Sequence, residues 1–327
     1  MTHRGWARWA SSGIFPLVTT LLLGERAFGQ RLLWDSAGAL PGNLAYVEYE
    51  NLKALREMPD FPSLRRACTG NSLRGLEGWL QAFGVKEENV VELVVGLEEG
   101  KDGFQIFAVA SGQFNPALAS EGSSSDPRFV PTEIGDVTGY CSARASERPP
   151  CAVLRGQNWA ALGAREFLSY VVGGGDGLTE PLSSEPEFMD LAAMVPKDAP
   201  LWGFARGVAA VQWFKQNIPF ADSVPIVWSS TLKGLDGLTY SVMPDEHQVH
   251  VTVNLQYKTS SGASFLGMVL EGVKAIEGLL WHGQHPAETN PFSDAQVDVD
   301  DRSVSLALSV SYETLESGLP WALARGR

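Results

Sequence analysis

The chain has 327 residues, a formal net charge of −13 at pH 7 and a hydrophobic content of 44%. A chain this acidic repels phosphate backbones, and no stripe of Lys and Arg interleaves with aromatic residues, so nucleic acid is excluded as a partner. At roughly 150 residues per domain, the length predicts two domains or one duplicated unit with cores of its own.

The first 29 residues have the pattern of a secretory signal. Arg4 and Arg8 precede an apolar run over residues 14–23, which is too short to cross a bilayer. Ala27 and Gly29 supply the small residues that a signal peptidase reads, so we expect cleavage after Gly29 and a mature chain that begins at Gln30. The sequence therefore predicts export, to the periplasm or the cell surface.

Cleavage would change the charge and the relation to the membrane. The segment carries three arginines and one glutamate, so its removal takes the net charge from −13 to about −15. An uncleaved segment that anchors the protein is the alternative, and membrane contact is expected only in that case.

Hydrophobic periodicity predicts the elements of the first half. A strand over residues 44–50 leads directly into a helix at 51–55, and a second helix is expected over 72–83. Two strands and a further strand and helix follow, and the glycines at 173–177 interrupt the chain. Those strands are predicted at residues 90–97 and 104–110, the strand-helix pair at 159–172, and surface loops at 121–126 and 146–150.

The second half opens as the first does, with a strand that runs into a helix. A helix over residues 184–195 precedes it, and Ser184 with Glu187 predicts a capping box there. The long helix at 261–281 has apolar residues at spacings of three and four, which predicts one buried face. The other elements are a strand at 200–205, a helix at 208–215, strands at 226–233, 238–243 and 250–257, a hairpin at 295–299 and 304–310, and a helix at 312–319.

Consecutive antiparallel strands with helices between them are typical of an α+β protein. The recurrence of the strand-helix opening predicts two related halves, residues 30–183 and 184–327, each an antiparallel sheet with helices packed on one face.

Three short segments carry a resemblance. They are residues 40–47 (LPGNLAYV), 195–203 (VPKDAPLWG) and 304–310 (VSLALSV), which follow the signal peptide. In these the chain resembles a group of uncharacterised exported bacterial proteins, and the likeness extends over most of the mature chain. The resemblance implies export and a duplicated α+β fold, and it implies no activity.

The three cysteines allow two interpretations. In an oxidising compartment Cys141 and Cys151 could form a disulfide that closes the loop between them, which leaves Cys68 odd. The alternative is three free thiols in the core.

Two pairs of histidines raise the question of a metal site. His247 with His250, and His282 with His285, are each three residues apart, and Asp245, Glu246 or Asp294 could complete the sphere. A turn and a Gly/Pro-containing loop favour solvated histidines instead. The acidic patch Asp294, Asp298, Asp300 and Asp301 lacks the calcium-loop pattern, and we interpret it as a charged hairpin tip.

No catalytic or cofactor motif is present in the sequence. There is no G-x-S-x-G, and Ser230 with Lys233 matches S-x-x-K only on a helix, whereas we expect a strand there. The tryptophans of the second half, Trp202, Trp213, Trp228 and Trp281, fit core packing, with an apolar ligand groove as the alternative.

These observations favour an exported envelope protein that is not an enzyme and acts by binding or scaffolding. Its partner would be another envelope protein or an apolar ligand. The competing hypothesis is a metal-assisted hydrolase that uses the His247/His250 and His282/His285 regions. No cofactor is expected.

Overall fold

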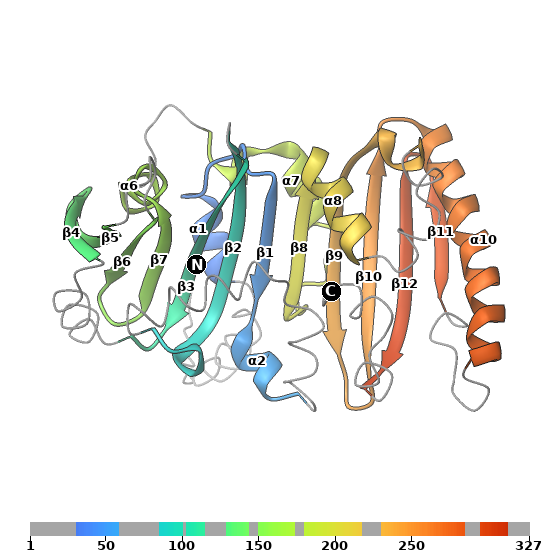
Figure 1. Cartoon of the computed structure of the whole chain (residues 1–327), viewed down its shortest axis with the longest axis horizontal. Helices are drawn as coiled ribbons and strands as arrows, with labels where there is room; N and C mark the ends of the chain where they lie inside the picture. Colours follow the sequence, from blue (N-terminus) through green and yellow to red (C-terminus); the bar gives the residue numbers. More distant parts are fainter. Residues whose placement is uncertain are drawn as a thin grey trace, which may run out of the picture.

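Twelve antiparallel strands form one continuous sheet in the computed structural model (Figure 1). The structure describes residues 31–58, 85–100, 103–114, 129–143, 150–173, 180–217, 230–284 and 295–312. Along the sheet the strands follow the order β11-β12-β10-β9-β8-β1-β2-β3-β7-β6-β5-β4. The protein is therefore α+β with a large antiparallel sheet, as the sequence predicts.

The strands have the following bounds. In the first half they are β1 (Tyr46–Glu50), β2 (Val90–Gly100), β3 (Gly103–Gly112), β4 (Phe129–Ile134), β5 (Val137–Ser142), β6 (Pro150–Arg155) and β7 (Trp159–Ala164). In the second half they are β8 (Leu201–Arg206), β9 (Leu235–Pro244), β10 (Gln248–Tyr257), β11 (Gln296–Asp300) and β12 (Ser303–Ser311).

Helices connect the strands. The α-helices are α1 (Arg31–Ala37), α2 (Leu52–Arg56), α6 (Arg165–Gly173), α7 (Pro186–Ala192), α8 (Gly207–Asn217) and α10 (Ser260–Gln284). Three 3-10 turns are η1 (Glu87–Asn89), η2 (Leu182–Ser184) and η3 (Leu232–Gly234). In the described part of the chain, no helix has both the length and the apolar character needed to cross a membrane.

The two halves meet where β1 pairs with β8. Their register runs from Tyr46 opposite Ala205 to Glu50 opposite Leu201, so the sheet continues without a break from one half to the other. The expectation that each half has its own sheet is wrong in this respect. Local periodicity predicts strands but does not say which edges pair, and here the first strands of both halves pair with each other.

Apolar side chains form two cores, one on each face of the sheet. Alternate residues of a strand point to opposite faces, and Leu93 and Val95 of β2 belong to one core while Val94 belongs to the other. Helices α2, α8 and α10 supply buried residues to the first core, and α1, α6 and α7 supply them to the second. The expectation that helices cover only one face is therefore also wrong, because each half has helix residues in both cores.

Local sequence explains several element boundaries. The side chain of Asn51 accepts a hydrogen bond from the backbone N–H of Ala54 (3.0 Å), which caps α2 directly after β1. The residues of β12 alternate between buried and more exposed along the strand, so one face of this strand is apolar and the other is rich in serine. That polar face carries Ser305 and Ser309.

Two sequence predictions are corrected by the structure. Ser184 does not cap α7, because Pro186 takes the first helical position and Glu185 precedes it without a side-chain capping bond. The predicted strand at 226–233 is helical from Ser230 into η3, and the strand β9 begins only at Leu235. Ser230 and Lys233 therefore lie on helical turns, and the argument from a strand against an S-x-x-K pair no longer applies.

Several predictions fall on residues that the structure does not describe. These are the signal segment at 1–29, the helix at 72–83, the loops at 121–126 and most of 146–150, and most of the helix at 312–319. They remain predictions.

Candidate functional site: a histidine, carboxylate and serine beside a hairpin turn

Asp245 fixes the turn between β9 and β10. Its Oδ1 accepts hydrogen bonds from the backbone N–H groups of His247 (2.7 Å) and Gln248 (2.8 Å), and its own N–H donates to the carbonyl of Gln248 (2.8 Å). These backbone hydrogen bonds, with a smaller effect from His250, lower the pKa of Asp245 to about 2. The hydroxyl of Tyr312 donates to the Asp245 carbonyl (2.9 Å), so the residue that follows β12 also holds the turn. Asp245 is therefore ionised and fixed in orientation at neutral pH.

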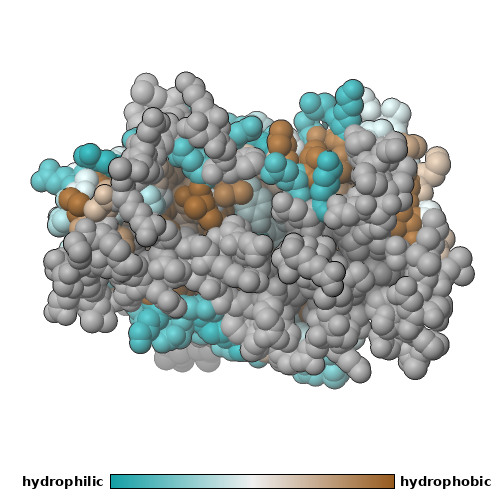
Figure 2. Space-filling model, viewed as in Figure 1, coloured by the Kyte–Doolittle hydropathy of each residue, from teal (hydrophilic) through white to brown (hydrophobic). Residues whose placement is uncertain are grey.

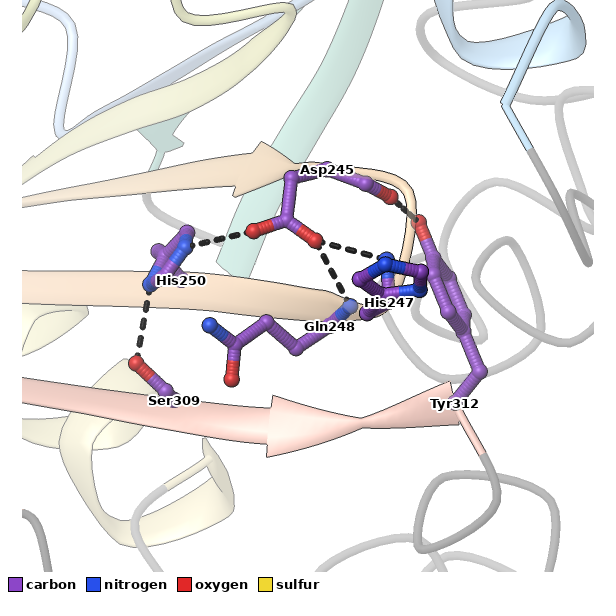
Figure 3. Close-up of polar contacts among 6 residues, drawn as sticks. All are labelled: Asp245, His247, Gln248, His250, Ser309 and Tyr312. Carbon is purple, nitrogen blue, oxygen red and sulfur yellow. Dashed lines mark hydrogen bonds and ion pairs between the residues drawn. The ribbon is translucent and has the colours of Figure 1, made fainter.

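The imidazole of His250 bridges Asp245 and Ser309. Its Nε2 lies 2.9 Å from Asp245 Oδ2, and its Nδ1 lies 2.8 Å from Ser309 Oγ (Figure 3). The contact with Ser309 follows from the register, since His250 of β10 and Ser309 of β12 are direct cross-strand partners. The side chains of both His250 and Asp245 are 45% exposed, so the group is accessible to solvent.

The ionised carboxylate decides which nitrogen of a neutral His250 carries the proton. A carboxylate only accepts hydrogen bonds, so Nε2 must donate to Asp245. Nδ1 is then left with its lone pair and accepts the hydroxyl proton of Ser309. The arrangement can take a proton from a serine hydroxyl, which is the chemistry of a general base.

The two histidines of the predicted metal pair point to different places. Figure 3 shows the His247 ring beside Tyr312, on the far side of Asp245 from His250. Both nitrogens of His250 already have hydrogen-bond partners. Within the described ranges, no three residues among His, Cys, Asp and Glu converge as metal ligands.

The other candidate ligands are placed as follows. His282 lies on α10, which extends to Gln284 and so includes residues expected in a loop, but its side chain is outside the described part, as are His285 and Asp294. Asp298, Asp300 and Asp301 lie exposed on the β11–β12 hairpin. Asp301 accepts a hydrogen bond from Ser260 at the start of α10 (2.5 Å), so part of the acidic patch helps to dock the helix.

Cys141 and Cys151 form a disulfide in the structure. They are direct partners across the β5–β6 pair, so the bond links neighbouring strands as well as closing the segment between them. Cys68 lies outside the described residues.

A second polar group is buried where the halves meet. Glu48 of β1 accepts hydrogen bonds from the hydroxyls of Tyr46 (2.6 Å) and Tyr240, and the two hydroxyl oxygens are 2.6 Å apart. Tyr240 reaches β1 across β8 because Gly203 leaves space under its ring, where a Cβ would lie 2.4 Å from a ring carbon. Trp213 of α8 stacks on the same ring, with centroids 4.4 Å apart.

Burial and the neighbouring carboxylates raise the pKa of both Tyr46 and Tyr240 well above the ordinary value, so both are neutral donors at physiological pH. Trp213 of α8 covers the Tyr240 ring, and Glu48 and Tyr240 are buried. We assign it a structural role, because it ties β1 of one half to β9 of the other.

Sequence reasoning singled out His250 and Asp245, which lie in contact, but it missed Ser309 and Gln248. Ser309 lies 59 positions away and is brought to His250 only by strand pairing. Trp202 is 1% exposed, in keeping with core packing, and Trp213 packs on Tyr240. Trp228 and the side chain of Trp281 are outside the described part.

The chain was compared with family models, curated proteins and solved structures, and only solved structures match it. No protein-family model matches the chain, and no curated protein matches it. Among solved structures it is similar to crystal forms III and I of a protein called TP0453, each with a TM-score of 0.49, at 11% and 12% identity over 86% of this chain and 96% and 95% of that one. Form IV of the same protein gives a TM-score of 0.45 at 10% identity, over 87% and 96% of the two chains. Similarity at this level assigns no activity.

Proposed function

We propose that the protein is exported to the cell envelope and acts there by binding or scaffolding. The observation that carries the proposal is the continuous twelve-stranded sheet, whose described strands end at β4 on one side and β11 on the other. A long sheet with a core on each face is a stiff support, and a strand edge can add a further strand from a partner. The charged N-terminal pattern supports export, and the Cys141–Cys151 disulfide is compatible with an oxidising compartment.

We also infer a duplication with a boundary near residues 183 and 184. From the central β1–β8 pair the order runs outward as β1-β2-β3-β7 in one direction and β8-β9-β10-β12 in the other. In both halves the first strand leads into a helix, α2 or α8, and a long antiparallel hairpin follows. The two halves thus share an order of elements around their junction, which supports a common origin.

The edges and one end of the molecule offer surfaces for a partner. Val130 of β4 is 49% exposed and Val299 of β11 is 45% exposed. Near β11, Phe265 and Met268 of α10 also expose apolar atoms, and Figure 2 shows hydrophobic colour at the end of the molecule that α10 occupies in Figure 1. Such a surface suits another envelope protein or an apolar ligand.

A metal-assisted hydrolase has less support. It requires His250 to give up one of its two hydrogen bonds and His247 to turn toward it. Elemental analysis of protein purified without chelator separates this alternative, because it predicts stoichiometric zinc that a His247/His250 double variant loses.

Photo-crosslinking in cells tests the scaffold proposal. A photoreactive amino acid is introduced at Val130, at Val299 and, as a control, at Asp198, which is exposed in the turn before β8. We expect discrete adducts with an envelope component from one or both edge positions and none from Asp198. Absence of adducts from both edges, or adducts only with cytoplasmic proteins, would contradict the proposal.

A further inference from the structure

The group beside the β9–β10 turn holds a serine, an imidazole base, a carboxylate and an amide, which are the parts of a nucleophilic site. These are Ser309, His250, Asp245 and Gln248. We propose that Ser309 is an activated nucleophile that accepts acyl and phosphonyl groups from small activated esters, with His250 as its general base. This activity goes beyond the scaffold role proposed above and does not depend on it, since it uses the polar face of β10 and β12 rather than the edges of the sheet.

Hydrogen bonds hold His250 in the tautomer that can act as a base. Asp245 accepts from Nε2 and holds the tautomer in which Nδ1 faces the Ser309 hydroxyl at 2.8 Å. The backbone N–H groups of His247 and Gln248 fix the carboxylate in place. Serine-histidine-carboxylate sites are recognised by geometry and roles rather than by chain order, and either imidazole nitrogen can accept a proton once the other is committed.

Gln248 supplies a hydrogen-bond donor for the oxyanion. It precedes His250 by two residues on β10, so both side chains lie on the same face of the sheet. Figure 3 shows its side-chain amide extending into the space beside His250 and Ser309. An amide N–H at this position can donate to the oxygen that becomes negative when Ser309 attacks a carbonyl, as side-chain amides do in other oxyanion sites.

The proposed acyl transfer passes through an acyl-serine at Ser309. The Ser309 oxygen bonds to the carbonyl carbon while its proton passes to His250 Nδ1. The C–O bond to the leaving alcohol then breaks, and His250 returns the proton to that alcohol. Water, with His250 again as base, hydrolyses the acyl-serine to the free acid. His250 and Asp245 are half-exposed, so an ester can reach the site from solvent.

An alkyl fluorophosphonate tests the nucleophile directly. It forms a Ser–O–P bond and loses fluoride, with the serine proton leaving as HF, and the adduct is located by peptide mass spectrometry. We expect one labelled residue, Ser309, and loss of labelling in Ser309→Ala. The control is Ser305→Ala, because Ser305 lies on the same face of β12 but is paired with Asn254 rather than with histidine. It should label as the wild type does.

Reaction rates of variants test the roles of His250 and Gln248. His250→Gln should slow phosphonylation and the hydrolysis of p-nitrophenyl acetate by roughly 10²-fold or more, and Gln248→Ala should slow them by roughly 10-fold or more. Thermal melts verify that each variant is folded. Labelling that is spread over several serines, or a Ser309 adduct that forms equally fast in folded His250→Gln, would overturn the proposal.

Asp245 acts as a positioning residue, and its test uses the pH profile. Asp245→Asn keeps an oxygen for the backbone N–H groups of the turn but offers an amide N–H to Nε2, which favours the tautomer with the proton on Nδ1. We expect the fold to survive and the dependence of the rate on an imidazole base to disappear. A folded variant with an unchanged pH profile would show that Asp245 serves the turn alone, and would overturn its part in the site.

Discussion

Tyr240 is the residue that joins the two halves most directly. Its hydroxyl donates to Glu48 across an intervening strand, and its ring packs between Trp213 and the glycine of that strand. A buried hydrogen bond to a charged or strongly polar group is worth more than an exposed one, and leaving its partner with one fewer donor costs free energy. The Tyr240 hydroxyl therefore adds to the stability that the β1–β8 pairing and the Tyr46–Glu48 hydrogen bond give this junction.

Tyr240→Phe should lower the free energy of unfolding by about 1–3 kcal/mol at pH 7. The raised pKa of Tyr46 and Tyr240 means that the folded state binds their protons more tightly than the unfolded state does. Their contribution is complete below the ordinary tyrosine pKa of 10.0 and is lost as the pH rises above it. Urea unfolding at pH 7 and between pH 9 and 11 should show a shallower alkaline loss for Tyr240→Phe than for the wild type. Equal free energies of unfolding for the two proteins at pH 7 would show that the Tyr240 hydroxyl does not stabilise the fold.

The sequence could single out His250 and Asp245 but not the contact of His250 with Ser309. Spacing of three residues drew attention to His247, which the structure places on the other side of Asp245. Ser309, the second hydrogen-bond partner of His250, is distant in sequence and carries no local signature, because a serine on the polar face of a strand looks like any other solvated residue. Likewise, Glu48 and Tyr240 meet only through strand pairing, and this pairing cannot be predicted from local patterns in a single sequence.

At the scale of elements, strong periodicity was a reliable guide. The apolar spacing of the long helix predicts residues 261–281, and α10 spans Ser260–Gln284. The strand patterns at 44–50, 90–97 and 304–310 correspond to β1, β2 and β12. Predictions failed where one local signal competed with another, as when Pro186 displaced the start of α7 from Ser184. The predicted strand at 226–233 is helical over its described residues, from Ser230 on.

Leu270→Asp should unfold or aggregate the protein. Leu270 is 4% exposed on α10 and lies in the first core, so a carboxylate there loses its hydration without a partner. The cost is several kcal/mol, against the roughly 5–15 kcal/mol that holds a domain folded. The matched control is Met268→Asp, since Met268 is on the same helix and is 71% exposed. Thermal melts that rank the two variants equally would mean that this face of α10 is not buried.

At the scale of the whole molecule, the pairing of β1 with β8 is the feature that sequence could not supply. Each half carries the pattern of an antiparallel sheet, and periodicity is satisfied whether the two sheets are separate or joined. The structure joins them through residues 46–50 and 201–205, so the halves share one sheet and two cores. We therefore expect the two halves to unfold together rather than as independent domains.

Export is the claim on which the proposed role in the envelope rests, and an intact-mass measurement tests it most directly. The protein is expressed with its own N-terminus in a bacterial host, the envelope and cytoplasmic fractions are separated, and the mass is taken without reduction. We predict a chain from Gln30 to Arg327 in the envelope fraction, lighter by two hydrogens because of the Cys141–Cys151 bond. A full-length chain that begins at Met1 and remains in the cytoplasmic fraction would contradict the account.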